Sequence, residues 1–358
     1  MNRAIHQFVA GFHRGDAISN EAVLLRRVFQ GWGYSSEIFC EARRVMRELR
    51  GEVHDVATAP TVVQPDDIVL LHLSTGSEVN TVFGRLTCRR ALLYHNLTPP
   101  DFFRFFQPAT AMVLRQGLEQ MRSLTGSAQV NLADSRFNAD DLAAKGFPPA
   151  AVFPLCLDYN MLLGKPDART LAVSRDKLVN VLFVGRCAPN KKLDDVLTAF
   201  AVFQHHVEPA SRLVFAGSHG GMERYHVFLQ SRVRDLGVRN VVFTGGIPQA
   251  QLNAWYRSAS LFLCMSEHEG FCIPLIEAMV NDLPILAYAA GAIPETLDGA
   301  GVLVREKKYP VIAELMGELI RNLPLRAAVI ARQKRRLEAF RTRDYDAELR
   351  AHLAPLLV

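Results

Sequence analysis

Apolar residues along this chain follow two alternating patterns. Short continuous apolar runs, typical of buried strands, are separated by longer segments in which apolar residues recur every three or four positions, as on one face of a helix. In the first half this pattern predicts strands at 4–9, 37–40, 68–73, 91–96, 129–134 and 151–155, and helices at 18–30, 41–50, 109–124 and 138–145. Such alternation is typical of a parallel sheet with crossover helices.

The pattern lapses between residues 158 and 176, where the chain is polar and contains glycine and proline. It then resumes, with strands predicted at 179–184, 212–216, 241–244, 261–265, 285–288 and 301–304, and helices at 193–206, 222–236, 249–258 and 274–281. After residue 310 only helices are predicted. We therefore expect an α/β fold with two facing Rossmann-like domains, an interdomain cleft and a helical C-terminal segment. The expected domains are 1–165 and 166–330, with C-terminal helices at 331–358 that could pack back on the first domain.

Length and composition narrow the class of protein. The 358 residues suggest about two domains, and 49% hydrophobic with 22% charged residues excludes a disordered chain. No apolar run approaches a membrane-spanning length, and the first residues lack a secretory signal, so a cytoplasmic location is expected. The 41 basic and 36 acidic residues give a net charge of +5, too weak to indicate nucleic-acid binding.

The six cysteines indicate no disulfide framework, because they are widely spaced and several lie in apolar runs. No two pairs of Cys or His residues have zinc-site spacing, so a structural zinc site is not expected. The only Asp-x-Asp sequence is Asp344-Tyr345-Asp346, in the charged C-terminal region. We therefore predict no metal ligands and no dependence on a metal.

The stretch 266–277, SEHEGFCIPLIE, follows an apolar strand and precedes a helix that opens near Pro274. It places Glu269 in the loop and Glu277 in the expected first turn of the helix. Helix-terminal amides suit a phosphate or sugar oxygen, and the two carboxylates could accept hydrogen bonds from ligand hydroxyls. The alternative is that both carboxylates are solvated loop and capping charges.

The stretch 184–192, VGRCAPNKK, also joins an apolar strand to a helix. Gly185 permits a tight turn, and Arg186 and Lys191 stand at the carboxyl end of the strand, where they could neutralise a diphosphate. The alternative is a generic basic loop.

Together these two stretches resemble the retaining GT-B glycosyltransferases of family 4, the glycosyl transferases group 1 type. The family's Glu-x7-Glu signature corresponds to Glu269 and Glu277, and its Gly-Arg-x4-Lys loop to Gly185, Arg186 and Lys191. The resemblance covers nearly the whole chain and is strongest over 180–305. It implies an acceptor-binding first domain and a second domain that binds a nucleotide-sugar donor.

The resemblance also assigns roles to residues. Glu269 would approach the donor sugar hydroxyls, Glu277 the ribose, and Arg186 with Lys191 the diphosphate. The backbone amides of Phe271, Cys272 and Ile273 would face sugar and phosphate oxygens. Three residues depart from the family pattern: Cys272 and Asp282 stand where glycine is common, and Asn190 stands where glutamate is common. The Cys272 side chain could narrow the choice of donor.

In the first half, the turn after residue 9 contains Gly15 and Asp16. By the resemblance this loop approaches the donor phosphates through Gly15 and the acceptor through Asp16; alternatively Asp16 only caps a helix. The segment YHNLTPP, at 94–100, resembles a family element in which His95 faces the donor sugar and reaction centre. His72, at the end of an apolar strand, is a weaker candidate for acceptor binding. Asp134-Ser135 resembles a family strand–helix turn in which capping is expected.

The resemblance implies a hexosyltransferase that moves a sugar from a GDP- or UDP-sugar to a glycan or lipid-linked acceptor, in bacterial polysaccharide, lipopolysaccharide or related glycoconjugate synthesis. No cofactor is expected. The alternatives are another GT-B nucleotide-sugar enzyme, of the epimerase type, or a catalytically silent GT-B subunit. Basic residues exceed acidic ones by four over 85–122, around the aromatic DFFRFF, and by seven over 321–343. These basic segments suit a peripheral contact with the anionic inner face of the cytoplasmic membrane. The alternative is that they form a solvated basic surface.

Overall fold

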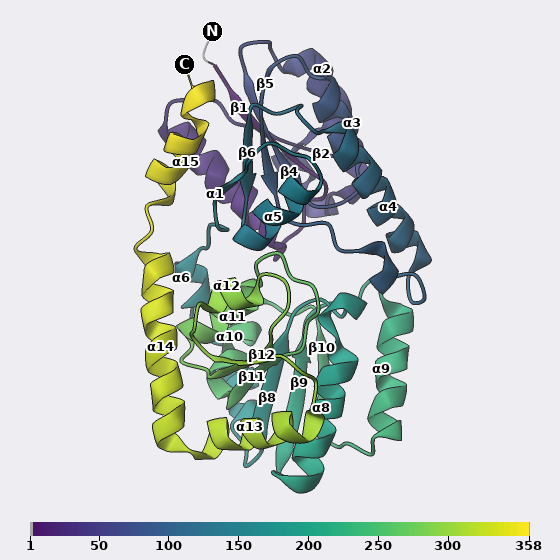
Figure 1. The fold of residues 1–358 in the computed structure, drawn as a ribbon, viewed down its shortest axis with the longest axis vertical. Coiled ribbons are helices and arrows are strands. Elements are labelled where there is room, and N and C mark those ends of the chain that lie inside the picture. The colour runs from purple at the N-terminus through teal and green to yellow at the C-terminus, as the bar shows by residue number, and fades with distance from the viewer. Residues whose placement is uncertain (1–2, 358) are drawn as a thin grey trace. The chain divides into compact units, whose positions relative to one another are not determined.

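The computed structural model describes residues 3–357, which divide into two units (Figure 1). The first unit contains the chain up to Asp101, then Pro108–Leu157 and Asp344–Val358. The second contains Phe102–Gln107 and Asp158–Arg343. The division after Leu157 lies at the start of the polar stretch that interrupts the sequence pattern, eight residues before the expected boundary. Residues 331–343 stay with the second unit, and only the last 15 residues return to the first.

The sheet of the first unit is entirely parallel and has the order β3-β2-β1-β4-β5-β6-β7. Its strands are β1 (Ile5–Val9), β2 (Ile38–Cys40), β3 (His54–Asp55), β4 (Ile68–Leu73), β5 (Arg89–Tyr94), β6 (Val130–Ala133) and β7 (Ala151–Val152). Its α-helices are α1 (Ala17–Gly31), α2 (Ala59–Val62), α3 (Glu78–Arg85), α4 (Pro108–Ser123), α5 (Arg136–Ala144) and α15 (Tyr345–Leu353). The chain order reverses between β1 and β4, where parallel α/β sheets bind ligands.

The sheet of the second unit repeats this plan with the parallel order β10-β9-β8-β11-β12-β13. Its strands are β8 (Val179–Val184), β9 (Ser211–Ala216), β10 (Val241–Gly245), β11 (Leu261–Cys264), β12 (Ile285–Tyr288) and β13 (Val302–Val304). Its α-helices are α6 (Tyr159–Leu162), α7 (Ala168–Ser174), α8 (Leu193–His206), α9 (Glu223–Asp235), α10 (Gln249–Ser258), α11 (Ile273–Val280), α12 (Ile293–Leu297), α13 (Tyr309–Arg321) and α14 (Leu323–Arg341). The switch point here lies between β8 and β11.

Each unit has its own apolar core. In the second unit, residues of β8, β9 and β11 pack with α8 and α13, as in the contacts of Phe183, Phe200 and Met316. In the first unit the C-terminal helix α15 completes one core layer: Leu349 and Leu353 pack with Phe29 of α1, and Figure 1 shows the two helices side by side. None of the described helices is long and apolar enough to cross a membrane.

The structure confirms the two parallel sheets and the helical C-terminal segment expected from the sequence, but the predicted helix at 41–50 is wrong. That segment forms two 3₁₀ turns, Ala42–Arg44 and Arg47–Glu52. Between them Val45 is extended and pairs with Phe12 in a parallel bridge, which a continuous helix would prevent. The sequence pattern also missed the short β3 and the helix α3.

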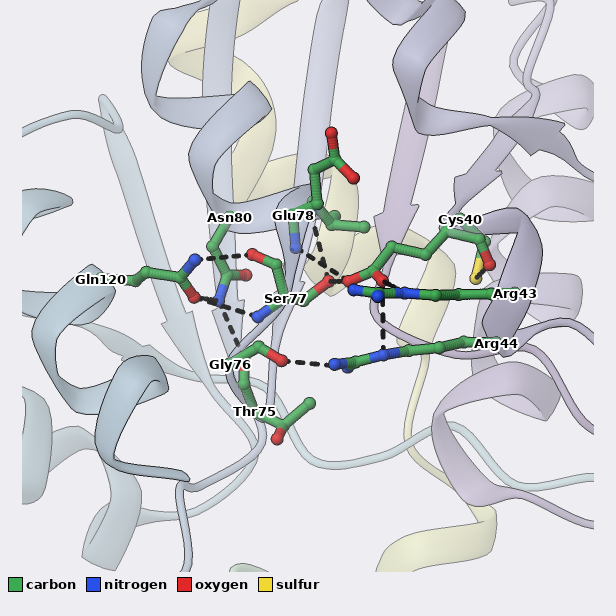
Figure 2. A network of polar contacts seen from close by, with 11 residues as sticks. Cys40, Arg43, Arg44, Thr75, Gly76, Ser77, Glu78, Asn80 and Gln120 are labelled. Atoms are coloured by element: carbon green, nitrogen blue, oxygen red, sulfur yellow. Dashed lines mark hydrogen bonds and ion pairs between the residues drawn. The ribbon is translucent and has the colours of Figure 1, made fainter. Parts of the chain in front are cut away.

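A polar network around Glu41 joins three parts of the first unit (Figure 2). The buried Glu41 carboxylate, just after β2, accepts hydrogen bonds from the Ser77 hydroxyl and the Glu78 amide, each at 2.8 Å, and from Arg43 Nε at 2.7 Å. Gln120 of α4 accepts from the Ser77 amide at 3.0 Å. Burial alone would raise the pKa of Glu41, but these hydrogen bonds outweigh it and lower the pKa. The network therefore fixes the loops after β2 and β4.

Candidate functional site

The loops after β8 and β11 meet at the switch point of the second sheet and bring Lys191 to Glu269. Lys191 Nζ donates to Glu269 Oε2 at 2.5 Å, and the Glu269 side chain is only 6% exposed. Burial lowers the pKa of Lys191, but the adjacent Glu269 carboxylate outweighs it, so the pKa is raised and the ammonium stays charged. The structure thus joins two residues that the sequence placed in separate motifs.

Hydrogen bonds to and from Asn190 hold these two loops together. Asn190 Nδ2 donates to the His268 carbonyl at 3.1 Å, and the Glu267 amide donates to the Asn190 carbonyl at 2.9 Å. The residue that departs from the family's glutamate therefore ties the two loops together. A third loop, after β12, supports Glu269: the Ala292 amide donates to its carbonyl at 3.0 Å. Gly291 passes so close that an added Cβ would lie 2.5 Å from the Glu269 carbonyl oxygen.

Glu277 lies on α11 beside Tyr256 of α10. The Tyr256 hydroxyl donates to Glu277 Oε2 at 2.6 Å, and both side chains are buried. Burial raises the pKa of Glu277, and the hydrogen bond from Tyr256 opposes this rise. Because α11 begins at Ile273, Glu277 is its fifth residue, so the prediction that it lies in the first turn is wrong. Burial of both glutamates also excludes the alternative that they are solvated surface charges.

Two of the three departures from the family pattern fall at left-handed backbone positions. Cys272, the residue before α11, has φ 73°, and Asp282, just after this helix, has φ 53°. Glycine adopts this conformation readily, whereas an L side chain costs roughly 1–2 kcal/mol there. This explains why glycine is common at both positions. The buried Cys272 thiol also lies close to Cys264 and Glu269, their ligand atoms being within 4.8 Å of one another.

The remaining donor-side residues line the same loops. Gly185 follows β8, and an added Cβ on the neighbouring Gly217 would lie 2.0 Å from the Gly185 carbonyl oxygen, so this turn requires glycine at 217. Arg186 is exposed on the same loop. Phe271 is buried against Phe340, with ring centroids 5.9 Å apart, and Ile273 opens α11. These positions leave the expected donor roles as predictions.

In the first unit, His72 and His95 lie together at the end of β4 and β5. His72 Nδ1 is 2.9 Å from His95 Nε2, and His72 Nε2 is 3.0 Å from Gln7 Oε1. His95 Nδ1 faces Asp134 Oδ2 at 3.4 Å. The ring of His95 is only 2% exposed, so in this structure both its nitrogens face buried groups and its expected contact with a donor sugar stays a prediction.

Glu21 of α1 completes this cluster and was missed from the sequence. Its Oε2 lies 3.5 Å from His95 Nε2 and 3.8 Å from His72 Nδ1, with no exposed side-chain surface. Burial raises the pKa of Glu21 to about 7, against the opposing effect of His95. Burial lowers the pKa of His72; it would also lower that of His95, but Asp134 and Glu21 raise it overall. The available signal was helical spacing, because position 21 lies three residues after Ile18 and four before Leu25, on the apolar face of α1.

The turn between β1 and α1 supports the capping alternative for Asp16. Its carboxylate accepts from the Ser19 amide at 2.9 Å and from the Ser19 hydroxyl at 2.7 Å, which makes it the N-cap of α1. Gly15 precedes it in a left-handed turn with φ 74°. Ser135 caps α5 in the same way through the Asn138 amide, as the sequence predicted.

Comparisons with known proteins agree with this arrangement. Residues 168–336 match the family described as glycosyl transferases group 1. The chain is 32% identical over 225 residues, 59% of its length, to a GDP-mannose-dependent alpha-(1-6)-phosphatidylinositol monomannoside mannosyltransferase of Mycolicibacterium smegmatis. It is also 32% identical over 185 residues, 49% of its length, to a D-inositol 3-phosphate glycosyltransferase of Streptomyces scabiei. The matched segments cover 57% and 41% of these relatives, so the chain spans about half of each.

Solved structures match over the whole chain. Sucrose-phosphate synthase from Thermosynechococcus elongatus has a TM-score of 0.77 at 16% identity, and the match covers 99% of both chains. The Anabaena protein HepE in complex with UDP-glucose has a TM-score of 0.75, with the same identity and coverage. At this identity the likeness establishes the fold. The chain thus has the GT-B fold, and its residues 168–336 are similar to the glycosyl transferases group 1 family.

Proposed function

We propose that this protein is a retaining glycosyltransferase of the family 4 type, which moves a hexose from a nucleoside-diphosphate sugar to an acceptor hydroxyl. The observation that carries the proposal is the buried Lys191–Glu269 pair at the switch point of the second sheet, with Glu277 and Tyr256 on the adjacent helices. The similarity of residues 168–336 to glycosyl transferases group 1 supports it.

The difficult step is cleavage of the bond between the sugar C1 and the diphosphate oxygen, because negative charge grows on the leaving group. Lys191 and Arg186 supply positive charge at the end of β8, and the amides opening α11 supply hydrogen-bond donors. Fixed charges and dipoles aimed at developing charge are usually the largest catalytic contribution. In this mechanism Lys191 exchanges part of its contact with Glu269 for the diphosphate.

Glu269 then accepts hydrogen bonds from donor sugar hydroxyls, and Glu277 binds the ribose hydroxyls. The Tyr256 hydrogen bond fixes the Glu277 carboxylate for this role. Phe271, Cys272 and Ile273 present backbone amides, while Gly185 lets the backbone approach the phosphates. The Cys272 side chain lies beside the sugar and narrows donor choice.

Retention of anomeric configuration follows from attack on the same face as the leaving group. The acceptor oxygen forms the new bond to C1 as the bond to the diphosphate breaks, and a phosphate oxygen takes the acceptor proton. No enzyme nucleophile is needed. From the family resemblance we also propose that Gly15 contributes to phosphate binding, Asp16 and His72 to acceptor binding, and His95 to the reaction.

The names of the relatives select the first donors for testing. One relative is named for GDP-mannose, and HepE was crystallised with UDP-glucose. We propose a GDP- or UDP-hexose, beginning with GDP-mannose, and no cofactor. A thermal-shift screen of nucleoside diphosphates and their sugars would identify the base, because a ligand of the folded state raises the melting temperature.

The decisive assay measures nucleoside diphosphate released in the presence of donor and acceptor, with the product anomer determined by NMR. A retained α-linkage from an α-linked donor supports the proposal. Release of nucleoside diphosphate without a transferred sugar would favour the epimerase-type alternative. Binding of donor with neither release nor transfer would favour a catalytically silent GT-B subunit.

We further propose a glycan or lipid-linked acceptor in polysaccharide or lipopolysaccharide synthesis, reached from the inner face of the cytoplasmic membrane. Phe105 supports this idea: its side chain is 70% exposed, and the Arg104 guanidinium lies 4.3 Å from its ring centroid. An exposed aromatic beside arginine suits an anionic membrane surface. Sedimentation with liposomes that contain or lack anionic lipid tests this, and no binding to either would remove the membrane contact.

A further inference from the structure

The buried cluster of the first unit contains three atoms that face one another and can all accept a hydrogen bond. They are Glu21 Oε2, His72 Nδ1 and His95 Nε2. Their side chains are at most 2% exposed, so bulk water does not reach them freely. Among the described residues, Glu21 Oε2 has no hydrogen-bond partner. A buried carboxylate oxygen is stabilised only when a hydrogen-bond donor or a cation faces it.

The neighbours of the two rings favour particular positions for the histidine protons. Gln7 Nε2 donates to the Ala22 carbonyl at 2.8 Å, so Gln7 presents its oxygen, an acceptor, to His72 Nε2. His72 therefore carries its proton on Nε2. The Asp134 carboxylate oxygen lies 3.4 Å from His95 Nδ1, and its negative charge favours the proton of His95 on Nδ1, although the contact does not have hydrogen-bond geometry. The two nitrogens that face each other at 2.9 Å are then both without a proton in the neutral rings.

The three distances also fit one metal ion. With separations of 2.9, 3.5 and 3.8 Å, the point equidistant from the three atoms lies about 2.0 Å from each, the bond length of Zn²⁺ to imidazole nitrogen and carboxylate oxygen. Gln7 and Asp134 face the ring nitrogens that point away from this position. In known metal sites, such outer partners orient the histidine ligands. A single proton between the rings would leave Glu21 Oε2 without a close donor, whereas a metal ion serves all three atoms.

We propose that Glu21, His72 and His95 bind a divalent transition metal of the Zn²⁺ class. The proposal replaces the sequence-based prediction of no metal ligands and is separate from the donor chemistry of the second unit. Two neutral imidazoles and one carboxylate are a ligand set typical of zinc, and the net charge left by Zn²⁺ is matched by Asp134. The ion would join β4, β5 and α1 at the switch point of the first sheet.

The test uses the full-length protein, cleared of metal with a chelator and titrated with Co²⁺ as a spectroscopic substitute for Zn²⁺. We expect one Co²⁺ per chain with visible d–d absorption, no sulfur-to-cobalt charge-transfer band, and a higher melting temperature with Zn²⁺. A strong charge-transfer band would instead place the ion at Cys264 and Cys272, which overturns the proposal. This readout needs no variant and no transferase activity, so it is independent of the proposed function.

Variants locate the site. His72→Gln and Glu21→Gln should each weaken Co²⁺ binding by at least about tenfold. The matched control is His219→Gln with His226→Gln, because these two rings stack 4.4 Å apart elsewhere and could bind metal adventitiously. Binding lost in the control but kept in His72→Gln and Glu21→Gln, or no binding by the folded wild-type chain, would overturn the proposal.

Discussion

The two sheets share one order over six strands, and each carries a buried polar cluster where the order reverses, yet the clusters are built in opposite ways. In the second unit each of the two glutamates faces a donor: Lys191 faces Glu269, and Tyr256 faces Glu277. In the first unit, Glu21, His72 and His95 bring three acceptors together. The same topology thus supports one site whose carboxylates already face donors and another whose geometry, in our proposal, fits a metal ion. Topology locates a site, and the side chains decide its chemistry.

The largest expected effect concerns the balanced pair. Glu269→Ala and Lys191→Ala should each lower the turnover of sugar transfer by at least about tenfold, because each removes a charge aligned with the reacting donor. Circular dichroism should show that the fold survives. Lys308→Ala is the control, since this side chain is 70% exposed and pairs only with the exposed Glu306 among the described ion pairs. Near-wild-type transfer by either variant would contradict the assignment of Glu269 and Lys191 to the active site.

The support beneath Glu269 can be tested separately. Gly291→Ala should lower both melting temperature and turnover, because its Cβ would meet the Glu269 carbonyl oxygen at 2.5 Å and the amide nitrogen at 2.9 Å. Gly299→Ala is matched to it: its φ is also positive, at 79°, but a Cβ there meets no atom within 4 Å. It should cost only the backbone strain of about 1–2 kcal/mol. Equal activity losses in both variants would contradict a special role for residue 291.

Loss of the Tyr256 hydrogen bond should weaken donor binding as well as lower the stability of the fold. Tyr256→Phe leaves the Glu277 carboxylate buried without this donor, so we expect an unfolding free energy lower by roughly 1–3 kcal/mol. The KM for the donor should also rise severalfold. Tyr225→Phe removes a comparable buried hydrogen bond, to Asp194 Oδ1 at 2.7 Å, and should leave the donor KM unchanged. If the two variants have the same KM for the donor, Glu277 does not bind the ribose.

The last expected effect is on stability alone and depends on pH; it concerns the network of Figure 2. The pKa of Glu41 is lowered in the folded protein, so its carboxylate stabilises the fold above its unfolded pKa, and this contribution is lost as the pH falls through the folded pKa. Glu41→Gln should therefore destabilise by roughly 1–3 kcal/mol near neutral pH, and the difference should shrink below about pH 4. Denaturant unfolding across this range measures it. A pH-independent difference would mean that Glu41 acts by shape rather than charge.

The periodicity of the sequence predicted most elements, because alternation of apolar runs with helical spacing is a local property. It failed at 41–50, where the bridge between Phe12 and Val45 overrides helical spacing. It correctly placed the motifs of Lys191 and Glu269 after strands β8 and β11, and the roles of these residues remain predictions. It missed Glu21, because a carboxylate within a helix is ordinarily read as exposed, although its spacing places it on the buried face.

The sequence by itself therefore determined the α/β class, the repeat of two parallel sheets and the strand ends that carry polar motifs. Only the tertiary structure decided which side chains meet. Val9 pairs with His72 across β1 and β4, and Leu73 pairs with Tyr94 across β4 and β5, which brings His72 beside His95. Glu21 joins them because α1 packs on this sheet. Contacts among residues so far apart in the chain depend on strand register and helix packing, which no local spacing encodes.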